Sequence, residues 1–425
     1  MLSRTYRSSL ALWGLFLCLV PAPAQEKFHY PERRHGQGQL RYVNGVPVLL
    51  VQGTSEEIGD QVANLAVGPA QRMVTYPKEL LAAIGAPRMW GPVLALGKSM
   101  LPQFPEAYRR EMDAMLRRYP QYADLLIAGN TAFDIKKMVA CSSLIVEPTR
   151  SKNGRLLFGR NLDFPGLDFL HEYTLVTVYR PQGKRAFVSV GFPGMVGVLS
   201  GMNEAGLSLA ISESFGSRDK APAFDRKGVP YALIFRRILE ECGTLDEAEA
   251  LLRSLPRTTH NNLTICDVKT GGVLEISTKN VVRRRAADGY CTCTNHFLSP
   301  EMCLRPTPNT YDTLDRLGAL EKFRSTARFG LEEVSHALHA ANMGELTLQS
   351  MIFEPETRTL YLALGTPPAT RQPYHAIPLK ALFTGQWPSV PRPGASTSRP
   401  GEGTNSPPAG KSSALKPGPG PFLPW

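Results

Sequence analysis

The chain has 425 residues, of which 43% are hydrophobic, and its formal net charge is +11. This length allows one large domain or two ordinary ones, and the hydrophobic content is sufficient for a packed core. Its basic residues are scattered, apart from the run Arg283-Arg284-Arg285, and no aromatic residues are interleaved with them, which argues against a nucleic-acid partner. Beyond the N-terminus no apolar run reaches the roughly 18 residues that a transmembrane helix needs, and no feature fixes the oligomeric state.

The first 24 residues are predicted to be a cleavable signal peptide. Arg4 and Arg7 form a positive start, residues 10–20 form a short apolar stretch, and small residues precede a cut after Ala24, which is the pattern of secretory signals. An ordinary N-terminal helix is disfavoured because Pro21 would stop it. We therefore expect an exported protein, secreted or periplasmic.

Residues 25–140 are predicted to be mostly helical. The stretch Ser55–Val62 begins like a capped helix, with Ser55 as the candidate cap. A second stretch, Glu106–Arg118, places apolar residues at helical spacing. No cluster of catalytic residue types stands out in this segment.

From Cys141 onward the pattern changes to strands and then alternates in blocks of strands and helices. Strands are predicted at Ser142–Val146, Arg155–Gly159, Tyr173–Tyr179, Ala186–Val190, Leu207–Ile211, Asn262–Asp267, Val273–Ser277, Thr347–Phe353 and Thr359–Leu364. Helices are predicted at Pro230–Cys242, Thr244–Leu255, Tyr311–Phe323 and Leu331–Ala341, with Thr244 as a cap. Blocks of this kind indicate a layered α+β domain and not a series of βαβ units.

Residues 389–425 are rich in Pro, Gly, Ser and Thr. Such a composition cannot bury enough apolar surface to order itself. We therefore predict a disordered tail outside the catalytic unit.

Six cysteines remain after removal of the signal peptide, and they leave the pairing open. Cys291 and Cys293 are too close for an easy bridge with each other, but either could pair with Cys303. Zinc at these three residues and His296 is disfavoured because the Cys-x-Cys spacing is not the usual Cys-x2-Cys. We expect no metal and no cofactor.

The pattern around Cys141 has two interpretations. Cys141 opens an apolar strand, and Arg160 and Asp163 follow at the end of the next one. A thiolate is reactive and needs a positive surrounding, so the three residues can form a nucleophile with its partners. A buried cysteine in an ordinary strand pair is the alternative, because free cysteines are among the most buried residues.

Three motifs decide between these interpretations, and they occur in the order Gly159-Arg160-Asn161-Leu162-Asp163, Gly201-Met202-Asn203-Glu204-Ala205-Gly206-Leu207 and Thr294-Asn295-His296-Phe297. Together they resemble the N-terminal-nucleophile hydrolases of linear amides, in the group of choloylglycine hydrolases and acyl-CoA:6-aminopenicillanate acyltransferases. The resemblance covers about residues 141–365.

The resemblance implies a four-layer αββα fold and a precursor that cuts itself between Ala140 and Cys141. Residues 25–140 would then be a pro-region and residues 141–388 the catalytic domain. The cut frees the α-amino group of Cys141, whose ordinary pKa of about 8 suits a base for its own thiol.

The resemblance also assigns roles to site residues. Cys141 would attack the acyl carbonyl and form a thioester, Asp163 would hold the new amino group, and Arg160 would favour the thiolate. Asn295 would donate into the oxyanion hole, and Glu213 stands where relatives carry either a second asparagine or a glutamate. As alternatives, Asp163 could cap a turn and Asn295 could close one.

One motif departs from the family pattern. Relatives carry a pair of arginines near a later helix, where this chain has Thr313 and then Arg316. Either Arg316 is an ordinary surface residue, or Arg305 supplies the missing charge. The residue that contacts the substrate on this side is therefore open.

We expect an exported hydrolase of N-acyl amides that can also act as an acyltransferase, and whose partner is a small-molecule N-acyl amide. A lipid ester hydrolase resembling the phospholipase-B-like proteins is one alternative. A non-catalytic binding protein on the same fold is another, although Cys141, Arg160, Asp163 and Asn295 would then have no reason to occur together.

Overall fold

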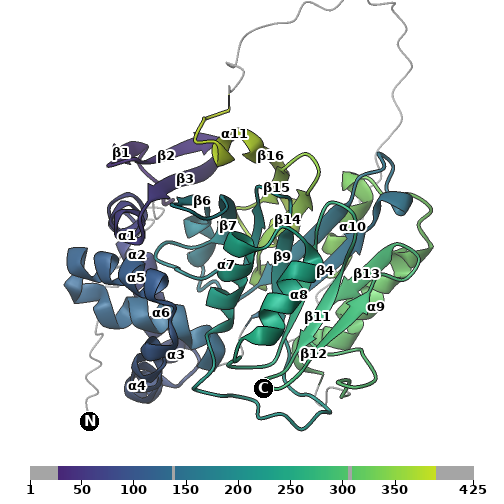
Figure 1. The fold of residues 1–425 in the computed structure, drawn as a ribbon, viewed down its shortest axis with the longest axis horizontal. Helices are drawn as coiled ribbons and strands as arrows, with labels where there is room; N and C mark the ends of the chain where they lie inside the picture. The colour runs from purple at the N-terminus through teal and green to yellow at the C-terminus, as the bar shows by residue number, and fades with distance from the viewer. Residues whose placement is uncertain (1–26, 136–138, 305–308, 389–425) are drawn as a thin grey trace, which may run out of the picture. The chain divides into compact units, whose positions relative to one another are not determined.

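The computed structural model describes residues 27–135, 139–304 and 309–388. The predicted signal peptide, the predicted tail and Arg305 lie outside these ranges. Within them two β-sheets pack between two sets of helices (Figure 1). Across the described ranges, none of the helices combines the length and the apolarity that a membrane crossing requires.

The larger sheet has ten strands in the order β1-β2-β3-β6-β7-β8-β9-β10-β11-β12. They are Arg33–His35, Gly38–Val43, Val46–Gly53, Leu175–Pro181, Phe187–Gly191, Ser200–Asn203, Ser208–Glu213, Asn261–Cys266, Gly271–Ile276 and Val281–Arg285. Neighbouring strands are antiparallel, except that β3 pairs in parallel with β6. A parallel pair needs a long connection, and here the helices of the N-terminal segment supply it.

The smaller sheet has six antiparallel strands in the order β13-β4-β5-β14-β15-β16. They are Tyr290–Cys293, Ala140–Val146, Leu157–Asp163, Thr347–Glu354, Thr359–Ala363 and His375–Pro378. In the central pair Ala140 faces Asp163, and Ser143 faces Arg160. This register brings the beginning of β4 beside the end of β5.

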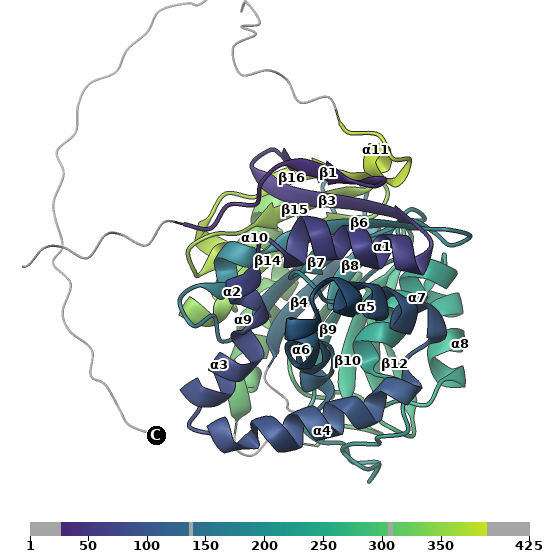
Figure 2. The same cartoon turned by 90° about the vertical axis from the view of Figure 1, so that its left-hand side faces the viewer.

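The helices cover the two outer faces of the sheet pair. On the side of the larger sheet they are α1 (Ser55–Val62), α2 (Gln71–Val74), α3 (Tyr76–Ala83), α4 (Trp90–Met100), α5 (Glu106–Arg118), α6 (Ala123–Ile135), α7 (Tyr231–Glu241) and α8 (Leu245–Ser254). On the side of the smaller sheet they are α9 (Thr313–Glu321) and α10 (Leu331–Ala340), and a short α11 (Leu379–Phe383) follows β16. Figure 2 shows α1, α3, α4, α5 and α6 together on one side of the molecule.

Three apolar clusters fill the spaces between these layers. The largest joins the helices α1, α5, α7 and α8 to the larger sheet and reaches Cys141. A second lies between the sheets and combines residues such as Val178 of β6 and Phe353 of β14. A third joins the smaller sheet to α10, for example through Leu144 and Leu338. Helix, sheet, sheet and helix therefore form four layers, and the predicted αββα fold is confirmed.

The structure differs from the sequence prediction in the N-terminal segment. Helices occupy most of the described part of residues 25–140, as the sequence predicts, but this part begins with three strands that were not predicted, β1 to β3, which extend the larger sheet. Thr54, and not Ser55, is the N-cap of α1, because its side chain accepts the Glu57 N–H while the Glu57 side chain accepts the Thr54 N–H. This reciprocal pair is a capping box. The prediction of Thr244 as the cap of α8 is confirmed.

Candidate active site

Cys141 is the second residue of β4 and is fully buried. Side chains alternate along a strand, so Leu144 packs toward α10 while Ser143 points to the larger sheet, where its hydroxyl lies 2.8 Å from that of Thr264. Cys141 has the same parity as Ser143. Its thiol therefore lies on the side of β4 that faces the larger sheet.

Arg160 contacts the thiol directly. Its Nη2 lies 3.1 Å from Cys141 Sγ and 3.3 Å from the carbonyl oxygen of Ile211 on β9. Among the described residues, its Nε and Nη1 have no hydrogen-bond partner. Burial raises the pKa of the Cys141 thiol to about 12, although the positive charge of Arg160 opposes the rise. In this structure the sulfur is therefore a thiol beside a cation.

Asn295 holds the backbone on the other side of Cys141. Its Oδ1 accepts the Cys141 N–H at 2.9 Å, and its Nδ2 donates to the carbonyl oxygens of Val139 at 3.1 Å and Glu213 at 2.9 Å. The Asn295 N–H donates to Thr313 Oγ1 at 2.8 Å, which orients the residue. These contacts are not those of a residue that merely closes a turn.

Glu213 is the last residue of β9 and is fully buried. Its Oε2 accepts the Val139 N–H at 2.9 Å, and its Oε1 lies 3.4 Å from the hydroxyl of Tyr231. The carboxyl group therefore contacts the residue that precedes Ala140. Glu213 and Asn295 together hold both backbone polar groups of Val139.

Asp163 is buried at the end of β5, beside Ala140 in register. Its Oδ1 accepts a hydrogen bond from Thr347 at 2.6 Å, whereas its Oδ2 has no hydrogen-bond donor among the described residues. Burial raises the pKa of this carboxyl above its ordinary value, and the Arg316 guanidinium limits the rise. A buried position inside a strand contradicts the alternative that Asp163 caps a turn.

Arg316 on α9 lies inside the same site. Its Nη1 donates to the Cys141 carbonyl oxygen at 2.6 Å and lies 3.6 Å from Asp163 Oδ2, and its Nη2 donates to Asn295 Oδ1 at 2.7 Å. The side chain is only 5% exposed. The alternative that Arg316 is an ordinary surface residue is therefore wrong, and sequence reasoning missed a site residue that the family pattern had marked.

Two further motif residues have supporting roles. Asn203 Nδ2 donates to the carbonyl oxygens of Leu239 and Cys242 at 2.9 and 2.7 Å, so its side chain ties β8 to the end of α7. His296 Nδ1 lies 2.9 Å from Thr313 Oγ1, and burial lowers the pKa of His296 to about 4. Both residues therefore have structural roles.

The cysteines show no pairing in the part of the chain that is described. Cys141, Cys242, Cys266, Cys291, Cys293 and Cys303 are all free, so neither bridge to Cys303 that the sequence left open is present. No group of three or more His, Cys, Asp or Glu side chains that could hold a metal ion occurs within residues 27–135, 139–304 and 309–388.

All five candidate residues therefore come together around one peptide segment. Arg160 contacts the sulfur of Cys141, Asn295 its N–H, and Arg316 its carbonyl oxygen. Glu213 contacts the segment through Val139, and Asp163 lies beside Ala140. The arrangement fixes a thiol and the peptide bond that precedes it, and it offers a carboxylate oxygen that can accept a new hydrogen bond.

Comparison with known proteins finds one curated relative. A relative from Archaeoglobus fulgidus, described as an uncharacterized protein, is 25% identical over 379 residues, and the match covers 75% of this chain and 62% of that protein. The chain thus spans about three fifths of the length of this curated relative.

Solved structures of three amide hydrolases also match, at low similarity. An N-acylethanolamine-hydrolyzing acid amidase ortholog from Caenorhabditis elegans has a TM-score of 0.40 and 16% identity, covering 56% of this chain and 100% of that one. A mutant of conjugated bile acid hydrolase from Clostridium perfringens has a TM-score of 0.41 and 16% identity, covering 56% and 92%. Penicillin V acylase from Agrobacterium tumefaciens has a TM-score of 0.35 and 12% identity, covering 53% and 83%.

A model of a protein family also matches the chain. The family model described as acyl-coenzyme A:6-aminopenicillanic acid acyl-transferase matches residues 149–369, which is more than half of the chain and includes Arg160, Asp163, Glu213, Asn295 and Arg316. The chain therefore belongs to the acyl-coenzyme A:6-aminopenicillanic acid acyl-transferase family.

Proposed function

We propose that this protein is an exported, self-processing cysteine hydrolase that cleaves linear N-acyl amides through a thioester, with the ability to pass the acyl group to an amine. One observation carries the proposal: separate elements hold the sulfur, the N–H and the carbonyl oxygen of Cys141, while a buried carboxylate oxygen of Asp163 beside Ala140 has no hydrogen bond within the described residues. A buried ordinary cysteine has no need of such an arrangement.

Processing would begin within the strand β4. Cys141 Sγ attacks the carbonyl carbon of Ala140, so that a C–S bond forms, the Ala140–Cys141 C–N bond breaks, and the nitrogen takes the thiol proton. Water then hydrolyses the thioester, which leaves a carboxyl group on Ala140 and restores the thiol. The hydrogen bonds of Asn295 and Arg316 to the Cys141 backbone hold this peptide still during the attack.

After the cut, Cys141 carries an α-amino group whose ordinary pKa is about 8. Asp163 Oδ2, which has no donor among the described residues, supports this step because it can accept a hydrogen bond from the new amino group. The amino group takes the thiol proton as the sulfur attacks the substrate carbonyl, and it returns that proton to the leaving amine. Water releases the acid from the thioester, or a second amine takes the acyl group.

Two further side chains would act on the charges that develop. Arg160 favours the thiolate because its Nη2 lies 3.1 Å from the sulfur. Asn295 Nδ2 now donates to Val139, and once Val139 leaves, this group is available to a substrate oxyanion. Loss of one such donor costs roughly 3 kcal/mol of barrier in known enzymes.

Two cysteine variants test the proposal. Cys141→Ala should remain uncut and inactive on a panel of N-acyl amides, penicillins and bile-salt conjugates, as measured by intact mass and product release. Cys242→Ala, which changes another buried free cysteine, should be cut and active. If the wild-type chain hydrolyses these amides while it remains uncut, the proposal of self-processing is wrong. If the enzyme prefers the matching esters, the proposed amidase activity is wrong and the protein is an esterase.

Export and the domain boundaries belong to the same proposal. We propose a cut after Ala24, a pro-region at 25–140, a catalytic domain at 141–388 and a tail outside it at 389–425. N-terminal sequencing of the protein released by its cells checks the first two cuts, because mature chains should begin at Gln25 and Cys141. A protein retained in the cytoplasm with Met1 in place would contradict export.

A further inference from the structure

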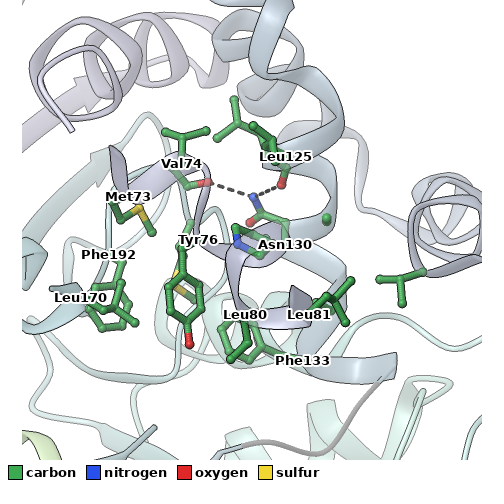
Figure 3. Close-up of a pocket in the computed structure, with 18 of the residues that line it drawn as sticks. Met73, Val74, Tyr76, Leu80, Leu81, Leu125, Asn130, Phe133, Leu170 and Phe192 are labelled. Carbon is green, nitrogen blue, oxygen red and sulfur yellow. Dashed lines mark hydrogen bonds between the residues drawn. The ribbon is translucent and has the colours of Figure 1, made fainter. Parts of the chain in front are cut away.

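An apolar cavity of about 90 Å³ lies between the N-terminal helices and the loops that follow β5 and β7. Helices α3 and α6 contribute Leu80, Leu81 and Phe133, and the later loops contribute Phe164 and Phe192. Figure 3 shows Leu80, Leu81, Phe133 and Phe192 around a common space. The cavity wall therefore comes from both sides of the proposed cut.

The polar groups of the wall are already engaged. Asn130 Nδ2 donates to the carbonyl oxygens of Leu126 and Gly194, both at 2.9 Å, and its Oδ1 accepts the Val196 N–H at 2.7 Å (Figure 3). The hydroxyl of Tyr76 donates to the carbonyl oxygen of Pro165. No charged side chain lines the cavity within the described residues. A ligand here finds hydrocarbon surface and almost no free hydrogen-bonding group.

One residue of the cavity wall, Phe164, links it to the candidate active site, because Phe164 and Cys141 belong to the same apolar cluster. Phe164 follows Asp163 directly in the chain, and Asp163 faces Ala140 across the sheet. The Phe164 ring packs against the rings of Tyr76 and Phe133, with centroid distances of 5.6 Å in both cases. The residue next to the Asp163 carboxylate is thus part of the cavity wall.

We propose that this cavity binds the apolar acyl group of the substrate, so that the N-terminal segment determines acyl specificity. The inference rests on the proposed function and specifies its substrate class. A dry cavity of ~150 Å³ lined by Leu, Ile and Phe binds benzene, so the smaller cavity here fits a short, unbranched alkyl chain. Each methylene that enters should raise kcat/KM about four-fold until the cavity is full.

The test uses a series of straight-chain N-acyl p-nitroanilides, from acetyl to decanoyl, with the processed enzyme. Ala132→Leu places three more carbons in the cavity wall and should lower kcat/KM for the best substrate by roughly sixty-fold, while the optimum moves about three carbons shorter. The matched control is Ala95→Leu on the exposed face of α4, outside the cavity, and it should leave the profile unchanged.

A milder variant keeps the test valid if Ala132→Leu does not fold. A Cβ at Gly129 would meet only Pro77 Cγ, at 3.9 Å, which is an ordinary contact. Gly129→Ala should therefore fold and move the optimum about one carbon shorter, with about a four-fold loss for the longest chain that fits.

The outcomes separate this inference from the proposed function. If the enzyme hydrolyses the series with equal efficiency, or if both cavity variants keep the wild-type profile, the acyl-site inference is wrong and the amidase proposal stands. If no amide is hydrolysed, the proposed function fails. Binding of octanoate then tests whether the cavity takes up an apolar chain. Fluorescence of Trp90, which lines the cavity, should respond to octanoate in the wild type and more weakly in Ala132→Leu; no response, or an equal one, overturns the inference.

Discussion

Replacing Arg316 by Met should abolish most of the self-cleavage. The variant keeps a long apolar stem but removes the donors to the Cys141 carbonyl oxygen and to Asn295 Oδ1, at 2.6 and 2.7 Å. A hydrogen bond to a charged group contributes about 1.5–3 kcal/mol, and only the part that is realised in the transition state lowers the barrier, so loss of both raises the barrier by at most about 3–6 kcal/mol. This upper limit corresponds to a cleavage rate about 10²–10⁴-fold lower.

The same variant should shift the pH dependence of the residual activity. Burial raises the pKa of Asp163, and the charge of Arg316 limits that rise. Without Arg316 the carboxyl group takes up a proton at a higher pH. Since the proposed mechanism needs the carboxylate to hold the new amino group, the acid limb of kcat/KM should move to higher pH.

The assay follows precursor synthesised in a cell-free extract by intact mass over time. Arg257→Met is the matched control, because Arg257 is another buried arginine that donates to backbone carbonyl oxygens, here those of Leu252, Leu255 and Ser277. The control should lose stability in urea but cut at the wild-type rate. If Arg316→Met cuts at that rate and keeps its acid limb, the role assigned to Arg316 is wrong.

The remaining predictions concern the same buried groups. Thr347→Val removes the hydrogen bond that lowers the pKa of Asp163, so kcat/KM should fall most at acid pH, as a pH–rate profile would show; an equal fall at every pH would contradict the role. Because the pKa of Asp163 is raised, the folded state binds the carboxyl proton more tightly than the unfolded state, in which the pKa is about 3.9. The protonated Asp163 therefore stabilises the fold fully below about pH 3.9. This stabilisation is lost as the pH rises through the folded-state pKa. In the uncut Cys141→Ala background, Asp163→Asn should therefore gain urea stability relative to its parent between pH 4 and 7, and a constant difference would refute this. Because burial raises the thiol pKa to about 12, iodoacetamide should alkylate Cys141 slowly at pH 8 in uncut chain and faster in cut chain, as peptide mass spectrometry would measure. Glu111→Ala removes one of the two carboxylates that pair with the buried Arg236 guanidinium, the one 2.7 Å from its Nη2, and leaves Glu240 at 2.8 Å from its Nε, so unfolding in urea should show a loss of about 2 kcal/mol; a loss below about 1 kcal/mol would contradict it.

Part of the site could be predicted because neighbouring strands bring it together. Cys141, Arg160 and Asp163 lie on the adjacent antiparallel strands β4 and β5, so their spacing in sequence fixes their spacing in space. Glu213 and Asn295 come from distant segments, and only the resemblance to a family indicated them. Arg316 contacts Cys141 from 175 residues further along the chain. No local pattern reports such a contact, and only the family motif, which Thr313 interrupts, could have indicated it.

The same reasoning explains the errors in the N-terminal segment. Strand β3 pairs with β6, so that Val48 faces Val176 across a long stretch of helices. Periodicity within a segment cannot reveal a partner so distant, and helices dominate the segment by length. The cap of α1 was readable, because Glu57 follows Thr54 at the spacing of a capping box.

The N-terminal segment is too deeply integrated to be discarded after a cut. It supplies three strands of the larger sheet. Its Glu111 also pairs with Arg236 of α7, and both side chains are almost completely buried. Removal of the segment would expose the largest apolar cluster of the protein and would take one of its two carboxylate partners from the buried Arg236 guanidinium. We therefore expect both pieces to remain associated after processing.

A cut before Cys141 would nevertheless change the site locally. In the uncut chain Val139 occupies both Glu213, through its N–H, and Asn295 Nδ2, through its carbonyl oxygen. The Cys141 nitrogen is a peptide N–H that cannot act as a base. Cleavage of the Ala140–Cys141 peptide bond would create the base, the α-amino group of Cys141. The same bond keeps Val139 against Asn295 Nδ2, the proposed oxyanion donor. Maturation and exposure of the site would then be a single event, because the residues that block the substrate position are those that the cut releases.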